Sequence, residues 1–150
     1  MGLRRFSAGG NGGKRVRAIA KGGPSAEVLV GLKDHWPMGV AHVVLPAGGG
    51  MPEHDHSSSS TMLIPIEGTV TLIDAEGDGS LEMEPGSVAT IPIGHRVAIS
   101  NPGDSEAKLI VVFDPPDLSS LVNSNFFVAG PRIGSGSDSV TRIRLESTGT

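Results

Sequence analysis

Residues 48–68 read GGGMPEHDHSSSSTMLIPIEG, and residues 86–101 read GSVATIPIGHRVAISN. In both stretches short apolar runs, rich in β-branched residues, end at Gly or Pro. Such runs favour β-strands, and Gly and Pro between them favour turns. The two stretches therefore predict short strands joined by tight turns.

The same pattern extends over most of the chain. Apolar or alternating runs occur at 15–20, 27–32, 40–45, 62–66, 69–72, 81–83, 88–91, 97–99 and 109–113. No run of 11 or more residues has the i, i+3, i+4, i+7 spacing of an amphipathic helix, and the best short helix candidate is 116–122. About ten short strands without long helices predict an all-β sandwich or barrel.

The two ends of the chain differ from this middle part. Residues 1–14 contain five glycines and no apolar period, and we expect a flexible N-terminal arm there. We place the barrel at residues 15–128. Residues 129–150 are Gly/Ser-rich, and their alternating Arg142–Leu145 run is a candidate C-terminal edge strand. Edge strands near both termini lead us to expect a homodimer.

Composition excludes several classes of function. The formal net charge is −4 with 19% charged residues, which gives no electrostatic footprint for nucleic acid or an anionic membrane. There are no cysteines, so disulfides and thiolate metal sites are excluded. No apolar stretch reaches membrane-span length, and the N-terminus has no apolar segment typical of a signal peptide. We expect a cytoplasmic protein without nucleic-acid or membrane partners.

His54 and His56 are the strongest candidates for chemistry. In an extended segment, residues i and i+2 point to the same face, so the two imidazoles project together and Asp55 points away. Two neighbouring imidazoles can ligate one divalent cation. The alternative is an exposed loop, which the neighbouring Gly48–Met51 and Ser57–Ser60 favour.

The spacing around this pair resembles the cupin superfamily. Gly48 stands six positions before His54, and Gly68 ends the next run, as in the first cupin motif. Gly86, Pro92, Gly94 and Asn101 match the register of the second motif. The resemblance covers residues 39–113 and implies a cupin-type double-stranded β-helix, a jelly-roll barrel of one domain.

The resemblance also implies three histidines and one glutamate around a metal, and here the sequence departs from it. Thr61 stands where the glutamate is expected, and Val97 where the third histidine is expected. His95 has the same strand parity as Val97, so it is a candidate third ligand that would complete a three-histidine site. The alternative for His95 is an exposed turn histidine.

Other side chains are candidates for the same pocket. We expect Ser60, Thr61 and Val97 to line the substrate pocket, with hydroxyls near its mouth. His42 lies in an apolar strand whose one face should line the barrel. It is either a core histidine or a general base, because an imidazole titrates near neutral pH.

These observations lead to two main hypotheses. The first is a small metal-dependent cupin enzyme that acts on an oxygen-bearing small metabolite through His54, His56 and His95. It would be a dioxygenase or a redox-neutral lyase, isomerase or cyclase, and its divalent metal would be Fe, Zn, Mn or Ni. The second is a non-catalytic cupin that binds or senses a small ligand, with or without metal. A purely structural barrel is a third.

Overall fold

The computed structural model describes residues 2–10, 15–18, 22–56, 58–77, 79–117 and 127–129, with only the backbone for residues 17, 18 and 127–129. The described residues form eleven strands and one short 3₁₀ helix, η1 (Leu32–Asp34). The strands are β1 (Arg15–Ala18), β2 (Ser25–Val30), β3 (Gly39–Leu45), β4 (Gly50–His54), β5 (Ser60–Glu67), β6 (Val70–Asp74), β7 (Ser80–Met83), β8 (Ala89–Ile91), β9 (Val97–Ser100), β10 (Ala107–Asp114) and β11 (Phe127–Ala129).

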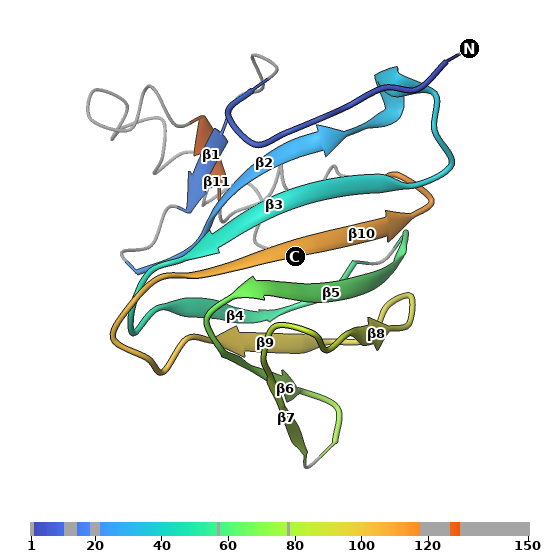
Figure 1. Cartoon of the computed structure of the whole chain (residues 1–150). Coiled ribbons are helices and arrows are strands. Elements are labelled where there is room, and N and C mark those ends of the chain that lie inside the picture. The colour runs from blue at the N-terminus through green and yellow to red at the C-terminus, as the bar shows by residue number, and fades with distance from the viewer. Residues whose placement is uncertain are drawn as a thin grey trace.

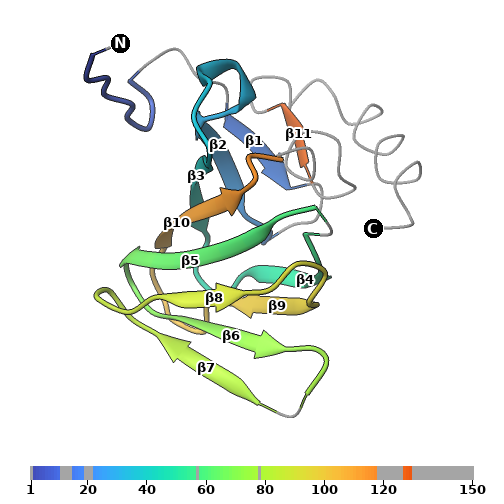
Figure 2. The same cartoon turned by 90° about the vertical axis from the view of Figure 1, so that its right-hand side faces the viewer.

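The strands form two antiparallel sheets that face each other (Figures 1 and 2). The larger sheet has the order β11-β1-β2-β3-β10-β5-β8, and the smaller has the order β4-β9-β6-β7. Strands β7 and β8 are edge strands of different sheets. The predicted all-β architecture is confirmed, and the two sheets leave an open seam between these two edges.

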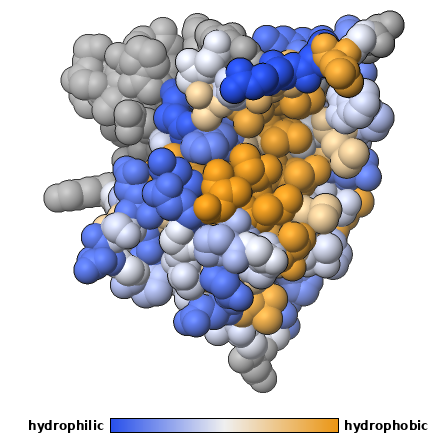
Figure 3. Space-filling view, in the orientation of Figure 1, coloured by the Kyte–Doolittle hydropathy of each residue, from blue (hydrophilic) through white to orange (hydrophobic). Residues whose placement is uncertain are grey.

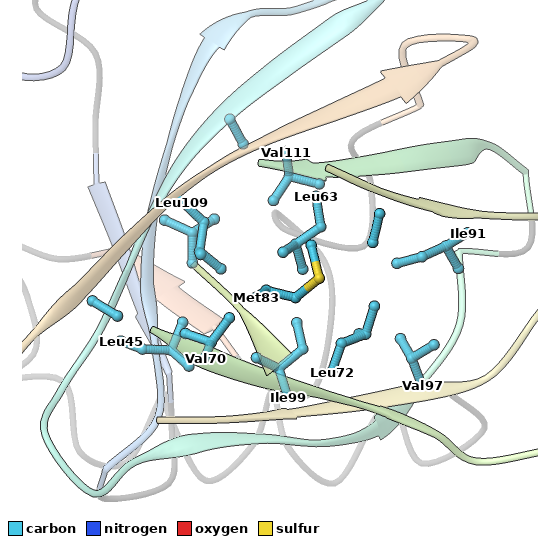
Figure 4. Close-up of a cluster of buried hydrophobic side chains, with 14 of the residues drawn as sticks. Leu45, Leu63, Val70, Leu72, Met83, Ile91, Val97, Ile99, Leu109 and Val111 are labelled. Carbon is cyan, nitrogen blue, oxygen red and sulfur yellow. The ribbon is translucent and has the colours of Figure 1, made fainter. Parts of the chain in front are cut away.

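Alternation along the strands builds the core. In β3 the side chains of Ala41, Val43 and Leu45 are buried, whereas the residues between them are only partly covered. Figure 4 shows side chains of both sheets, Leu63 and Val111 on one side and Leu72 and Ile99 on the other, pointing toward one another. Because burial of apolar area is the main stabilising term, this interior layer holds the two sheets together.

Three of the residues shared with the cupin motifs have structural roles that explain their residue type. Gly48 and Gly68 adopt φ values of 69° and 77°, a region that side-chain-bearing residues rarely occupy. The Asn101 side chain is buried and donates to the carbonyl oxygens of Leu45, Pro46 and Ser105 at 2.9–3.3 Å. It therefore ties the end of β9 to the turn after β3.

Some expectations from the sequence need comment. The Gly-rich segment before the histidine pair forms strand β4 and not a loop as far as His54. Most of the helix candidate at 116–122 and all of the run at 142–145 lie outside the described residues. Among the described residues, no helix is long and apolar enough to cross a membrane.

The N-terminal residues 2–10 lie against the larger sheet, and the flexibility of the N-terminal arm stays a prediction. They run along β2 in Figure 1, and the backbone N–H of Gly9 donates to both carboxylate oxygens of Glu27, at 2.9 and 3.0 Å. Glu27 is 3% exposed, so this contact lies under the arm. A composition rich in glycine did not reveal the carboxylate that holds the segment.

The outer face of the larger sheet is partly apolar. Met62 and Ile66 on β5 are 39% and 47% exposed, and Figure 3 shows a hydrophobic area where β3, β10 and β5 run in Figure 1. Large exposed apolar areas are typical of interaction surfaces. The homodimer stays a prediction.

Candidate functional site at the mouth of the barrel

Strand β4 carries the histidine pair to one end of the barrel. The rings of His54 and His56 meet edge to face, with centroids 5.1 Å apart. The His56 ring also contacts Phe113 on β10 in the opposite sheet, at 5.2 Å between centroids. The structure therefore brings both imidazoles together between the two sheets.

Both imidazoles are held in the neutral form. Burial lowers the pKa of His54 below its ordinary value, although a hydrogen bond to Pro52 acts in the opposite direction. Burial, together with the neighbouring His54, lowers the pKa of His56 to about 4. Because Nδ1 of His54 donates to the carbonyl oxygen of Pro52 at 2.8 Å, the neutral ring keeps its lone pair on Nε2.

Thr61 adds a buried hydroxyl close to the pair. It is the direct cross-strand partner of Phe113, so both side chains lie on the inner face of the larger sheet. The residue is 3% exposed, and its Oγ1 has no hydrogen-bond partner among the described residues. A buried hydroxyl without a partner costs about 1–3 kcal/mol, which is typical of a functional position or of a bound molecule.

A row of side chains crosses the smaller sheet at this end of the barrel. Val97 on β9 is the cross-strand partner of His54 on β4 and also of Asp74 on β6. Cross-strand partners point to the same face, so the row is His54, Val97, Asp74. Neighbouring strands are about 4.8 Å apart, so the two polar ends of the row are separated by roughly 10 Å.

His95 contacts Asp74 at the end of this row opposite His54. Its Nε2 is 2.7 Å from Oδ1 of Asp74, whereas its Nδ1 is 3.7 Å from Oε1 of Glu76. The hydrogen bond to Asp74 raises the pKa of His95, and the same bond lowers the pKa of Asp74. The row therefore has a neutral imidazole pair at one end and a charge-stabilised His–Asp pair at the other.

The loop before β9 explains why His95 lies beside Asp74. The backbone N–H of Ala75 donates to the carbonyl of Arg96 at 3.1 Å, and the N–H of Arg96 donates to Glu76 at 2.8 Å. The Arg96 side chain also pairs with Glu53 at 3.1 Å. The contacts with Ala75 and Glu76 dock the loop on the β6–β7 turn, and the contact with Glu53 ties it to β4.

A cleft of about 320 Å³ opens at the seam between β7 and β8. Its apolar wall includes Leu72, Ile91 and Val97, and its polar side includes Asp74, Thr90 and His95. A small molecule with an apolar body and one polar group fits such a lining. Val97 lines this cleft and also separates it from His54.

The described residues bring together only two of the four ligands that the cupin motifs imply for a divalent metal, His54 and His56. The second pair of positions implied by the cupin motifs holds a neutral hydroxyl, Thr61, and an isopropyl group, Val97. Among the described residues, no group of three or more His, Asp or Glu side chains could hold a metal ion. Catalytic metal sites such as those of zinc enzymes commonly have three protein ligands. The expected three-histidine group is not formed, because His95 pairs with Asp74.

Two predicted pocket residues lie elsewhere. His42 is on the outer face of the larger sheet, since its neighbours Ala41 and Val43 occupy the core, and Nη2 of Arg15 lies 2.9 Å from its Nδ1. Burial and the charge of Arg15 lower the pKa of His42. Ser60 donates to the carbonyl of Asp114 at 3.2 Å. Neither therefore serves the pocket as we expected.

Sequence reasoning missed Asp74 and Phe113. Asp74 follows Val70 and Leu72 at strand parity, and this parity was the available signal that its carboxylate faces inward. Phe113 has the same relation to Leu109 and Val111 on β10. Neither residue type is part of the spaced motifs, so only the contacts identify them.

Comparisons with known proteins support these observations. A family model described as a cupin domain matches residues 41–113. No match was found among curated proteins. The polyketide cyclase RemF from Streptomyces resistomycificus has a similar structure, with a TM-score of 0.60 and 16% identity over 75% of this chain and 79% of that one.

Two other solved structures are similar. KdgF from Halomonas sp. has a TM-score of 0.59 and 13% identity over 73% of this chain and 93% of that one. Ectoine synthase from P. lautus has a TM-score of 0.54 and 19% identity over 66% and 69%. At these identities the likeness shows the fold alone. Together with the family model, it confirms the predicted cupin-type barrel.

Proposed function

Because the chain belongs to the cupin superfamily and has a His–Asp pair at the mouth of its barrel, we propose that it is an enzyme that transfers protons on a small oxygen-bearing molecule. The observation that carries this proposal is the 2.7 Å contact between His95 and Asp74 at the edge of the seam cleft. The reaction class is redox-neutral: a lyase, isomerase or cyclase.

His95 would be the general acid–base group. Asp74 holds Nε2, so Nδ1 is the ring atom that can exchange its 3.7 Å neighbour, Glu76, for a substrate. A distance of 3.7 Å is too long for a hydrogen bond, so little is lost by that exchange. A histidine that a carboxylate orients, as Asp74 orients His95, suits proton transfer.

The rest of the mouth would hold the substrate. Leu72, Ile91 and Val97 would bind its carbon skeleton on the apolar wall of the cleft. The name of one similar structure, a polyketide cyclase, agrees with ring-closing chemistry on such a molecule.

The test is proton exchange with solvent. Small ketones, hydroxy acids and polyketide-like aromatics are incubated with the protein in D₂O, and C–H to C–D exchange is followed by NMR. We expect exchange for at least one class, and His95→Gln should slow it by roughly 10²–10⁴-fold. Lys108→Gln, on the outer face, should keep the full rate. An unchanged rate in His95→Gln would refute the assignment.

A second candidate is the metal-dependent enzyme. It is favoured by the Nδ1 hydrogen bond of His54 to Pro52, since metal-binding histidines commonly donate their other ring N–H to a carbonyl. The protein is purified without a tag, and Fe, Zn, Mn and Ni are measured per chain, with His54→Ala as the matched variant. Near-unit metal that is lost in His54→Ala favours this candidate. Binding without any turnover favours a ligand-binding or sensor protein.

A further inference from the structure

The packed N-terminal segment creates a second cleft, far from the seam in sequence and on the larger sheet. Residues 2–10 run along β2 in Figure 1, with Arg4 beside η1 and Gly9 beside Glu27. A cleft of about 450 Å³ lies between this arm and the sheet. Cations, carboxylates and apolar side chains all contribute to its lining. None of these residues takes part in the barrel mouth.

Both carboxylates in the lining already have donors. Glu27 accepts two contacts from the Gly9 N–H and lies 3.5 Å from Nη2 of Arg15. Asp34 accepts the Gly31 N–H at 2.8 Å through Oδ2. The negative charges of Glu27 and Asp34 are therefore balanced by donors of the protein itself.

The cations of the lining outnumber its carboxylates. The lining contains three cationic side chains, Arg4, Arg5 and Lys33, and two carboxylates, so its formal charge is positive in a protein of formal net charge −4. Nη2 of Arg4 donates to a neutral group, the backbone carbonyl of Asp34, at 2.8 Å. Within the described part of the chain, Lys33 has no carboxylate partner.

An apolar side of the cleft lies beside these charges. The lining includes Phe6 from the arm and Val28 and Leu29 from β2. The Arg4 guanidinium lies 5.4 Å from the centroid of the Phe6 ring, a contact that orients its planar group. Arginine held in this way binds carboxylate or phosphate oxygens through several N–H groups.

We propose that this cleft binds a small molecule that carries an oxyanion, phosphate or carboxylate, on a short apolar body. The oxyanion binds Arg4 and Lys33, and the apolar body packs on Phe6 and Leu29. Because Gly9 is tied to Glu27, the arm stays over the sheet and the site is preformed.

Three matched probes test the proposal by NMR titration of the full chain. Phenyl phosphate and benzoate carry the two oxyanions, and benzyl alcohol is their neutral counterpart. We expect one or both anions to shift the amide signals of Gly9 and Lys33 and to bind at least about tenfold more tightly than benzyl alcohol. The anion that binds more tightly identifies the oxyanion class.

Two variants assign the contacts. Arg4→Gln and Lys33→Gln change exposed side chains, and each should weaken binding of the better anion by about tenfold. Lys108→Gln, which removes a cation paired with Glu67 elsewhere on the sheet, should leave the affinity unchanged. Equal affinity for benzyl alcohol, no binding by the wild type, or equal losses in all three variants would overturn the proposal.

Discussion

The histidines at the two ends of one row differ in how the protein treats their charge. His56, with His54 beside it, is covered by both sheets and by Phe113, and burial depresses its pKa to about 4. His95 lies at the rim against Asp74, and its pKa is raised. Groups whose surroundings shift their pKa values apart are typical of acid–base sites. The comparison shows that location along one row of β-strands is enough to create the difference.

Phe113→Ala should uncover His56 and have the largest effect on stability. The side chain is 2% exposed, and its loss should lower the free energy of unfolding by about 3–5 kcal/mol. The pKa of His56 should also rise toward its ordinary value, because water reaches the ring. Chemical denaturation and NMR measure both. Ile93→Ala, at a residue 58% exposed, is the control and should change stability by about 0.5 kcal/mol or less.

The pH dependence of stability should separate the two ends. His56 has an ordinary pKa of 6.5 when unfolded and about 4 when folded, so the unfolded state binds the proton first. The free energy of unfolding should therefore fall between pH 6.5 and pH 4, by about 3 kcal/mol at 1.36 kcal/mol per pKa unit.

His95 should act in the opposite direction. Its folded pKa is raised, so its contribution is present below the unfolded pKa and is lost as pH rises through the folded value. Denaturation at a series of pH values measures both effects, and His56→Gln is the matched variant for the loss of stability on the acid side. If the acid-side slope is the same in His56→Gln, the account of His56 is wrong.

Thr61→Glu combined with Val97→His should convert the buried end into a metal site. The double change supplies the carboxylate and the imidazole that the cupin motifs imply beside His54 and His56. Metal at 100 times its dissociation constant should then stabilise the variant by about 2.7 kcal/mol. Thermal unfolding with and without Zn, Mn or Ni measures the gain, and Thr61→Gln with Val97→His is the neutral control. A folded double variant without any gain contradicts the placement of these four positions.

Asp74→Asn should have the smallest effect on the molecule and a specific one on His95. The pKa of His95 should fall toward its ordinary value, because its principal hydrogen bond to a charged partner is lost. The titration of His56 should not change. NMR of the imidazole protons follows both. Glu76→Gln is the comparison, and its effect should be smaller because that contact is 3.7 Å long.

Part of the fold could be predicted from local patterns. The 40–45 and 109–113 runs form β3 and β10, since alternation of buried β-branched residues sets both the strand and its inner face. Parity alone did not say which face of β3 would be inward, so His42 was misplaced. One register step decides this, and the contact of His42 with Arg15 lies 27 residues away along the chain.

The candidate site could be predicted only at one end. Spacing of i and i+2 brought His54 and His56 to one face. His95 had the expected parity with Val97, yet its partner is Asp74, 21 residues earlier. Whether His95 joins the histidine pair or binds Asp74 depends on how the loop before β9 docks on the β6–β7 turn. No local sequence pattern encodes that docking.

The sequence by itself determined the strands, their turns and the pairing of two histidines, because these depend on side-chain alternation and on backbone angles that glycine permits. Only the tertiary structure decided which carboxylate meets His95, which hydroxyl stays without a partner and which acid holds the N-terminal arm. Those outcomes depend on long-range strand register and on the burial of charge, and both exist only after the sheets have formed.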